Sequence, residues 1–180
     1  MPGKSDLEGG IVMRSITLCG FMGCGKSTVG RLLAGLTGRE LVDMDSYIER
    51  QAGLSVPAIF DRFGEADFRR RERAACAALG MRSGLIIAAG GGALTFPENA
   101  AALSRNGPIV LLDVPLDVIL RRLEGDATRP LLARPDKETA AKELYDRRLP
   151  LYRAAATHIV DAAGSPETVA RAILEAVGEE

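Results

Sequence analysis

The sequence has little of what several classes of protein require. Tryptophan is absent, aromatic residues make up 4% of the chain, and there are 3 cysteines and 1 histidine. So few aromatic rings argue against a surface that stacks the bases of single-stranded nucleic acid. An odd number of cysteines without paired metal-ligand spacing argues against a zinc site or a disulfide scaffold. The open question is therefore small-molecule chemistry.

The chain also lacks an excess of charge of one sign and a long apolar run. Lys and Arg number 23 and Asp and Glu number 24, which gives a formal net charge of −1 at pH 7. No run approaches the roughly 20 apolar residues of a membrane span, and the first residues lack the apolar stretch of a signal peptide. We therefore expect a cytoplasmic protein with no nucleic-acid or membrane partner, which must capture any anion locally.

The length of 180 residues and the 47% of hydrophobic residues suit one domain with a real core. Residues 1–12 are polar and aperiodic, so we expect a flexible N-terminal extension and a single domain over 13–180. Within it, short apolar runs alternate with longer helical patterns, which is typical of βαβ units and a parallel sheet. The patterns predict strands at 15–19, 40–42, 85–89, 109–113 and 157–160, and helices at 26–36, 46–52, 66–81, 97–104, 116–124, 137–155 and 166–177.

The strongest motif lies between the first expected strand and the first expected helix. Residues 20–27 read GFMGCGKS, which fits the pattern G-x-x-x-x-G-K-[ST] in the context that this pattern requires. In such a loop, backbone N–H groups and the helix N-terminus surround phosphate oxygens, Lys26 reaches the terminal phosphates and the Ser27 hydroxyl binds Mg²⁺. The residues therefore predict a phosphate-binding loop. A glycine-rich turn without a ligand is the weaker alternative.

Two further motifs follow strands at the same edge of the expected sheet. Asp43 and Asp45 stand where the second strand ends, and residues two apart in an extended segment point to the same side. The glycines at 90–92 follow the third strand and permit close backbone approach to a ligand. Ligands of doubly wound sheets lie outside the carboxyl ends of the strands, which favours one shared site. The alternatives are that Asp45 only caps a helix beginning at Ser46 and that the glycines only form a turn.

Arginines gather in two helical stretches although the net charge is near zero. Arg69, Arg70 and Arg71 are consecutive, so they cannot all face one ligand, and the helical spacing does not decide which one does. Arg147 and Arg148 by themselves are more typical of a solvated helix face.

One long polar connection, residues 125–135, is a candidate mobile lid. It contains Arg129, and Arg122 lies at the end of the helix before it. Closure would bring positive charge onto a transferring phosphoryl group. The isolated polar and sulfur-bearing residues are interpreted as structural: His158, Cys24, Cys76 and Asp113.

Together these motifs resemble those of the shikimate kinase family, P-loop kinases of the nucleoside-monophosphate-kinase type. The resemblance runs from about residue 15 through the last helix. Besides the phosphate loop, the aspartate pair and the triple glycine, it rests on Gly64-Glu65 to Phe68-Arg69-x-x-Glu72, Thr128-Arg129-Pro130-Leu131-Leu132 and Arg148-x-Pro150-Leu151-Tyr152. It implies a three-layer α/β fold, with a five-stranded parallel sheet in the order 2-3-1-4-5 flanked by helices, and a mobile lid. The implied reaction transfers the γ-phosphoryl group of ATP to the 3-hydroxyl of shikimate, giving 3-phosphoshikimate and ADP in aromatic amino-acid biosynthesis.

The resemblance also implies residue roles. ATP would bind Gly23, Cys24, Gly25, Lys26, Ser27, Thr28, Arg122 and Arg129. Mg²⁺ would bind Ser27 and, through water, Asp43. Shikimate would bind Asp45, Arg69, Gly90, Gly91, Gly92 and Arg148.

Three of these residues would be catalytic. Asp45 is the candidate base, and Lys26 and Arg129 would stabilise the transferred phosphoryl group. The resemblance selects Arg69 among the consecutive arginines, and Arg69 and Arg148 suit the substrate carboxylate. The family also implies a monomer.

Two departures from the family pattern stand out. Residues 161–165 lack the arginine that many relatives carry after the last strand, which leaves open how adenine is held, and Ala89 stands where a hydroxyl-bearing residue is common. Two other functions remain as alternatives. Another small-molecule kinase, of the gluconate type, would share the phosphate loop, but Asp45, Arg69 and Arg148 argue against it. Intact Lys26 argues against a non-catalytic nucleotide-binding regulator.

Overall fold

A parallel sheet of five strands forms the centre of the protein in this computed structural model, which describes residues 12–126 and 133–179. The strand order is β2-β3-β1-β4-β5. Every residue of β1 and β3 is buried, as expected for parallel strands that helices cover on both faces. The predicted α/β fold and strand order are confirmed. The strands are β1 (Ile16–Cys19), β2 (Glu40–Asp43), β3 (Leu85–Ala88), β4 (Ile109–Asp113) and β5 (His158–Asp161).

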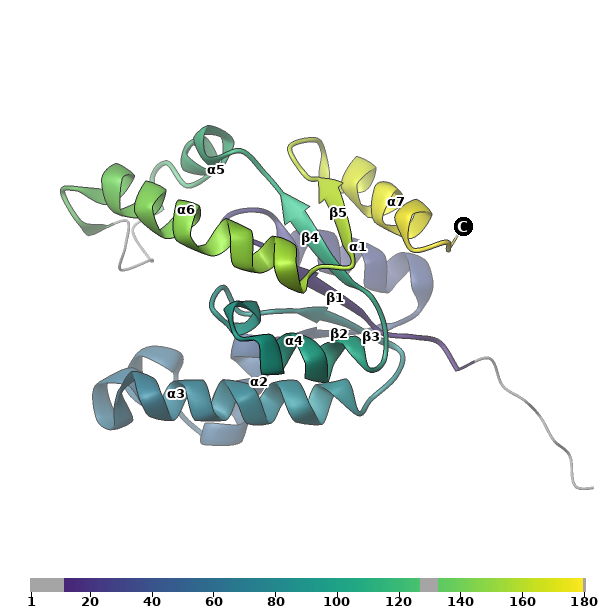
Figure 1. The fold of residues 1–180 in the computed structure, drawn as a ribbon, viewed down its shortest axis with the longest axis horizontal. Coiled ribbons are helices and arrows are strands. Elements are labelled where there is room, and N and C mark those ends of the chain that lie inside the picture. Colours follow the sequence, from purple (N-terminus) through teal and green to yellow (C-terminus); the bar gives the residue numbers. More distant parts are fainter. Residues whose placement is uncertain (1–11, 127–132, 180) are drawn as a thin grey trace, which may run out of the picture.

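Helices cover the sheet on both sides (Figure 1). Helices α1 (Lys26–Thr37) and α7 (Pro166–Ala176) pack together on one side, and α4 (Pro97–Ser104) and α6 (Lys137–Ala155) lie on the other. Helix α3 (Val56–Gly80) packs against α4 and against α2 (Met44–Ala52), while α5 (Leu116–Arg122) follows β4 and a short 3-10 turn, Ala93–Thr95, precedes α4. Within the described residues, no helix has the length and apolar character needed to cross a membrane.

Helix α3 begins ten residues earlier than the sequence pattern predicts, at 56 instead of 66. The Ser55 side chain accepts a hydrogen bond from the N–H of Ala58 at 3.3 Å and so caps the helix. The periodic pattern missed this first part because, before Gly64, only Ile59 is buried. At Gly64 the backbone leaves the helical conformation, with φ 80° and ψ 175°, and the chain bends.

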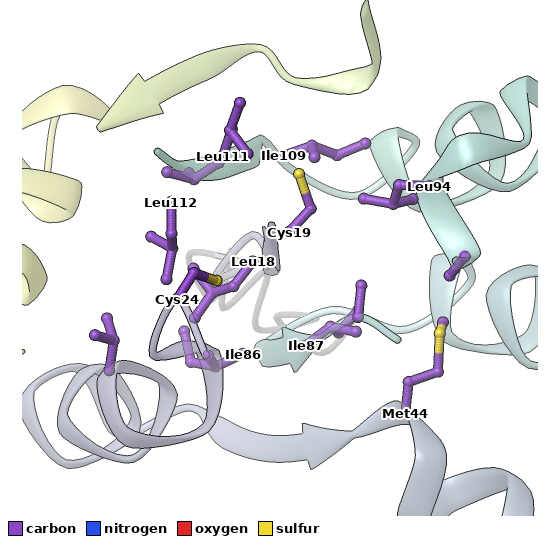
Figure 2. Close-up of a cluster of buried hydrophobic side chains, with 14 of the residues drawn as sticks. Leu18, Cys19, Cys24, Met44, Ile86, Ile87, Leu94, Ile109, Leu111 and Leu112 are labelled. Atoms are coloured by element: carbon purple, nitrogen blue, oxygen red, sulfur yellow. The ribbon is translucent and has the colours of Figure 1, made fainter. Parts of the chain in front are cut away.

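Buried side chains from the central strands form the core beneath the carboxyl ends of the strands, where the motifs lie. Figure 2 shows Leu18 from β1 among Ile86 and Ile87 from β3 and Leu111 and Leu112 from β4. In the sheet register Leu18 pairs with residue 88 and Cys19 pairs with Leu111. The segments that follow β1 and β3 therefore leave the sheet side by side, which brings the phosphate loop next to the triple glycine.

Candidate functional site

The phosphate loop joins β1 to α1. Gly25 occupies the cap position of α1 with a left-handed backbone (φ 101°), which glycine adopts without strain. The Lys26 ammonium folds back over the loop and donates to the carbonyl oxygens of Gly20, at 2.6 Å, and Phe21, at 3.2 Å. Because the Cys24 side chain is buried, its backbone is the part available to a ligand. The loop thus has the geometry that the motif predicts.

A cavity of about 440 Å³ lies at this loop. Arg122 also lines this cavity, and its guanidinium donates to the carbonyl oxygen of Cys24 in the phosphate loop, at 3.5 Å, and to those of Ala162, at 3.0 Å, and Ala163, at 3.1 Å, in the loop after β5. Guanidinium-to-carbonyl bonds of this kind fix both the arginine and the loop. The predicted ATP-binding residues within the described chain therefore line one cavity: Gly23, Cys24, Gly25, Lys26, Ser27, Thr28 and Arg122.

Asp43 and Asp45 do not share one extended segment, so that part of the sequence argument is wrong. Asp43 ends β2 and caps α2, where its Oδ1 accepts from the N–H of Ser46 at 3.0 Å. Asp45 lies in the first turn of α2. The alternative in which Asp45 caps this helix is also wrong, because Asp43 fills that position. Asp45 is therefore left free to face the triple glycine from the rim of the site.

The triple glycine lies where side chains from different helices converge. A Cβ atom added to Gly90 would lie 2.9 Å from Asp45 Oδ1, and one added to Gly92 would lie 2.5 Å from Arg69 Nη1. At Gly91 the nearest atom would be Arg148 Nη1, at 3.2 Å. These distances are shorter than normal contacts with a carbon atom. A side chain at one of these glycines would therefore displace the charged end of Asp45, Arg69 or Arg148, three predicted site residues that the fold brings together.

Arg69 is the member of the arginine run that reaches the triple glycine. Its guanidinium carbon lies 5.4 Å from the centre of the Phe68 ring and 5.6 Å from that of Phe96. Arg70 and Arg71 instead form ion pairs with the carboxylate of Asp67, each at 2.6 Å. The geometry agrees with the choice of Arg69 that the family resemblance made.

Glu72 belongs to a family motif but has no role predicted from the sequence, and the structure places it beside Arg69. Its side chain is 1% exposed, and its Oε1 accepts from Arg69 Nη1 at 2.8 Å. Burial raises the pKa of the Glu72 carboxyl, and the hydrogen bond and charge of Arg69 oppose that rise. The i, i+3 spacing from Arg69 was the available signal, but surface pairs share this spacing.

Charged groups of both signs act on the Asp45 carboxyl. Partial desolvation raises the pKa of its carboxyl and the neighbouring charge of Asp43 raises it further, while Lys26 and Arg69 lower it. A carboxyl with these neighbours suits a group that accepts a proton or a hydroxyl hydrogen bond. Lys26 of the phosphate loop and Arg69 beside the triple glycine thus both act on this carboxyl.

Helix α6 supplies Arg148 and Tyr152, which belongs to the same family motif but has no role predicted from the sequence. Tyr152 is 2% exposed, and its hydroxyl donates to the carbonyl oxygen of Gly91. Arg129 and residues 127–132 of the predicted lid lie outside the described residues. Of the residues interpreted as structural, Cys24 and Cys76 are buried, and Asp113 pairs with Arg153 at 3.2 Å.

Known proteins resemble this chain closely. A model of the shikimate kinase family matches residues 22–178. A shikimate kinase of Halorhodospira halophila is 47% identical over 163 residues, covering 90% of this chain and 92% of that protein. The solved structure of shikimate kinase from Acinetobacter baumannii in complex with shikimate has a TM-score of 0.84 and 40% identity, and covers 91% of this chain and 92% of its own.

A more distant likeness concerns the fold alone. The structure of a gluconokinase from Sinorhizobium meliloti has a TM-score of 0.62 and 16% identity, and covers 93% of each chain. The two shikimate kinases match this chain at more than twice that identity, which confirms the resemblance to their family that the motifs indicated. The family match over most of the chain and the high identity of these relatives show that the chain belongs to the shikimate kinase family.

Proposed function

We propose that the chain transfers the γ-phosphoryl group of ATP to the 3-hydroxyl of shikimate, with the residues around the phosphate loop and the triple glycine as its active site. The observation that carries this proposal is the convergence of Asp45, Arg69 and Arg148 on the three glycines, next to Lys26. The relative from Acinetobacter baumannii was solved with shikimate bound, at 40% identity, which supports the same acceptor here.

ATP binding is supported by the cavity at the phosphate loop. The N-terminus of α1 adds partial positive charge to the N–H groups of the loop, and Lys26 adds a full charge. Arg122 lines the same cavity and joins the phosphate loop to the loop after β5. We propose that the phosphates occupy the loop end and the base lies toward Arg122. This arrangement supplies a cation for the base end although residues 161–165 have none.

The oxygen donors present fit Mg²⁺. Ser27 is exposed in the first turn of α1, and Asp43 uses only one carboxylate oxygen to cap α2. The described residues contain no group of three or more metal-binding side chains, and Mg²⁺ is usually held by one or two protein oxygens together with water and substrate phosphates. Ser27 would bind the ion directly and Asp43 through water. When bound with ATP, the ion would neutralise charge on the phosphates.

The acceptor end combines cations with one carboxylate. Arg69 and Arg148 would bind the carboxylate of shikimate, since planar guanidinium groups pair well with carboxylates. Asp45 would accept a hydrogen bond from the 3-hydroxyl and take its proton as the phosphoryl group transfers. Positioning of the hydroxyl contributes at least as much as proton removal in such reactions. Lys26 and Arg129 would stabilise the charge on the transferred group.

A coupled assay of ADP release tests the proposed function. The protein is given ATP and Mg²⁺ with shikimate, gluconate or a nucleoside monophosphate as the acceptor. We expect ADP only with shikimate. Release of ADP with gluconate and not with shikimate would reject the proposal in favour of the gluconate-type alternative. The proposal includes a monomer in the cytoplasm, and sedimentation of the active protein tests its oligomeric state.

A further inference from the structure

Within the described residues, the triple glycine makes its hydrogen bonds through its carbonyl groups. The carbonyl of Gly90 accepts from the N–H of Ala93 at 3.1 Å, and that of Gly92 accepts from the Thr95 hydroxyl at 2.7 Å. The carbonyl of Gly91 accepts from Tyr152. The N–H groups of the three glycines donate to no acceptor within residues 12–126 and 133–179. Such N–H groups are suited to a ligand anion.

Tyr152 is the one of these partners that comes from a distant part of the chain. Ala93 and Thr95 follow the glycines directly, whereas Tyr152 lies 61 residues away, in α6. Because a peptide unit is planar and trans, a bond that fixes the carbonyl of Gly91 also fixes the opposed N–H of Gly92. The Tyr152 hydroxyl thereby sets the direction of a ligand-facing donor that it does not touch.

Tyr152 also lies on the same face of α6 as Arg148. Residues four apart in a helix are neighbours on one face, and Arg148 Nη1 approaches Gly91. Burial raises the pKa of Tyr152 to about 12, opposed by the charge and hydrogen bond of Arg148, so the hydroxyl keeps its proton at ordinary pH. One side chain thus connects the substrate-facing arginine of α6 to the substrate-facing backbone after β3.

We propose that Tyr152 is a positioning residue for the acceptor, which holds the Gly91–Gly92 peptide and Arg148 in the arrangement that binds the shikimate carboxylate. This inference rests on the proposed function, since it takes that carboxylate as the ligand. Glycine has the largest conformational freedom of any residue, so three in succession need an outside constraint to present N–H groups in a fixed direction. The Tyr152 hydroxyl provides that constraint before substrate arrives.

The test is Tyr152→Phe, which keeps the buried ring and removes only the hydroxyl. We expect the KM for shikimate to rise by about fivefold, the effect of losing one ordinary hydrogen bond, with kcat and the KM for ATP near those of the unchanged protein. Calorimetric titration with shikimate should show the same rise in Kd. The matched control is Tyr145→Phe, in the same helix, because the Tyr145 hydroxyl donates to the carbonyl of Val114 at 2.9 Å, away from the glycines.

A purely structural role predicts a different result. In that case Tyr152→Phe would lower the melting temperature or the active fraction and leave the KM for shikimate unchanged, and this outcome overturns the inference. Failure of Tyr152→Phe to fold even at low temperature, while Tyr145→Phe folds, also counts against it. If the unchanged protein forms no ADP with shikimate, the proposed function itself fails. If that protein is active and Arg69→Ala raises the KM for shikimate but Tyr152→Phe does not, only the positioning role is rejected.

Discussion

The buried carboxylate of Glu72 lies 2.8 Å from Arg69, measured from Oε1 to Nη1. Glu65 approaches the same guanidinium from the exposed side, at 3.5 Å from Arg69 Nε. Removing one partner of a buried pair leaves the other charge uncompensated, so the pair is sensitive to substitution on either side. The contact with Glu72 holds Arg69 near the triple glycine from its buried side.

Replacing Arg69 tests the assignment of the acceptor end. Arg69→Ala should raise the KM for shikimate by about 10-fold to 150-fold, the size of a lost hydrogen bond to a charged group. The KM for ATP should change little, because Arg69 does not line the cavity at the phosphate loop. Steady-state kinetics with each substrate varied in turn measure both constants. The control is Arg70→Ala, which removes a neighbouring exposed arginine bound to Asp67 and should leave both constants unchanged. If Arg69→Ala changed both constants equally, the assignment of Arg69 to the substrate carboxylate would be rejected.

The raised pKa of Glu72 predicts a dependence of stability on pH. A carboxyl with a higher pKa in the folded state than in the unfolded chain stabilises the fold at acid pH, below its ordinary value of 4.5. That contribution is lost as the pH rises through the folded-state pKa. The difference in unfolding free energy between the unchanged protein and Glu72→Gln should therefore fall as the pH rises from below 4.5 toward neutrality.

Urea unfolding followed by circular dichroism measures this difference at each pH. Glu65→Gln is the matched control, because it removes a carboxylate that also faces Arg69 but is 69% exposed. Its effect should be smaller than that of Glu72→Gln. A difference that grows with pH for Glu72→Gln would contradict the predicted direction.

The predicted role of Arg129 is tested by its effect on turnover. Arg129→Ala should lower kcat by at least about 100-fold, since groups that stabilise developing charge contribute this much or more. The KM for shikimate should change less than kcat. Arg134→Ala serves as the control, because Arg134 pairs with Asp136 at 2.7 Å and has no assigned role. An unchanged kcat would remove Arg129 from the phosphoryl site.

The bend at Gly64 predicts a loss of stability on substitution. Its backbone, at φ 80° and ψ 175°, is a conformation that residues with a Cβ rarely adopt. Gly64→Ala should lower the free energy of unfolding by about 1–3 kcal/mol, although no atom lies within 4 Å of the added carbon. Gly35→Ala, at an equally open position inside α1, should instead raise it by about 0.5–1 kcal/mol. Thermal and urea unfolding of both variants check the pair, and equal effects would contradict strain at Gly64.

Contiguous motifs carried most of what could be predicted from the sequence. The loop from Gly20 to Ser27 forms its site within eight consecutive residues, so its ligand chemistry needs no knowledge of the fold. The strand positions were also predictable, because each buried strand is a short apolar run. The strand order was available only through the family resemblance, since the apolar pattern does not determine which strands are neighbours.

Contacts between distant segments account for what was missed. The bond from Tyr152 to Gly91 spans 61 residues, and nothing local to either residue indicates it. Helix α2 begins at Met44, two residues before the predicted start at Ser46, so Asp43 and not Asp45 occupies its cap position. Helical spacing alone could not separate Arg69 from Arg70; the family resemblance made that choice, and the fold brings Arg69 to the triple glycine.

The hydrogen bonds from Arg122 to the loop after β5 bear on how the nucleotide preference of this enzyme could be changed. Arg122 holds that loop through main-chain oxygens alone, so the contact does not depend on which side chains the loop carries. Ala162 and Gly164 of this loop line the cavity assigned to the base, but Ala162 is buried in the core, whereas Gly164 is exposed and has no atom within 4 Å of an added Cβ. Gly164 is therefore a position at which substitutions could change the preference among nucleotides while the phosphate loop and the acceptor end stay intact.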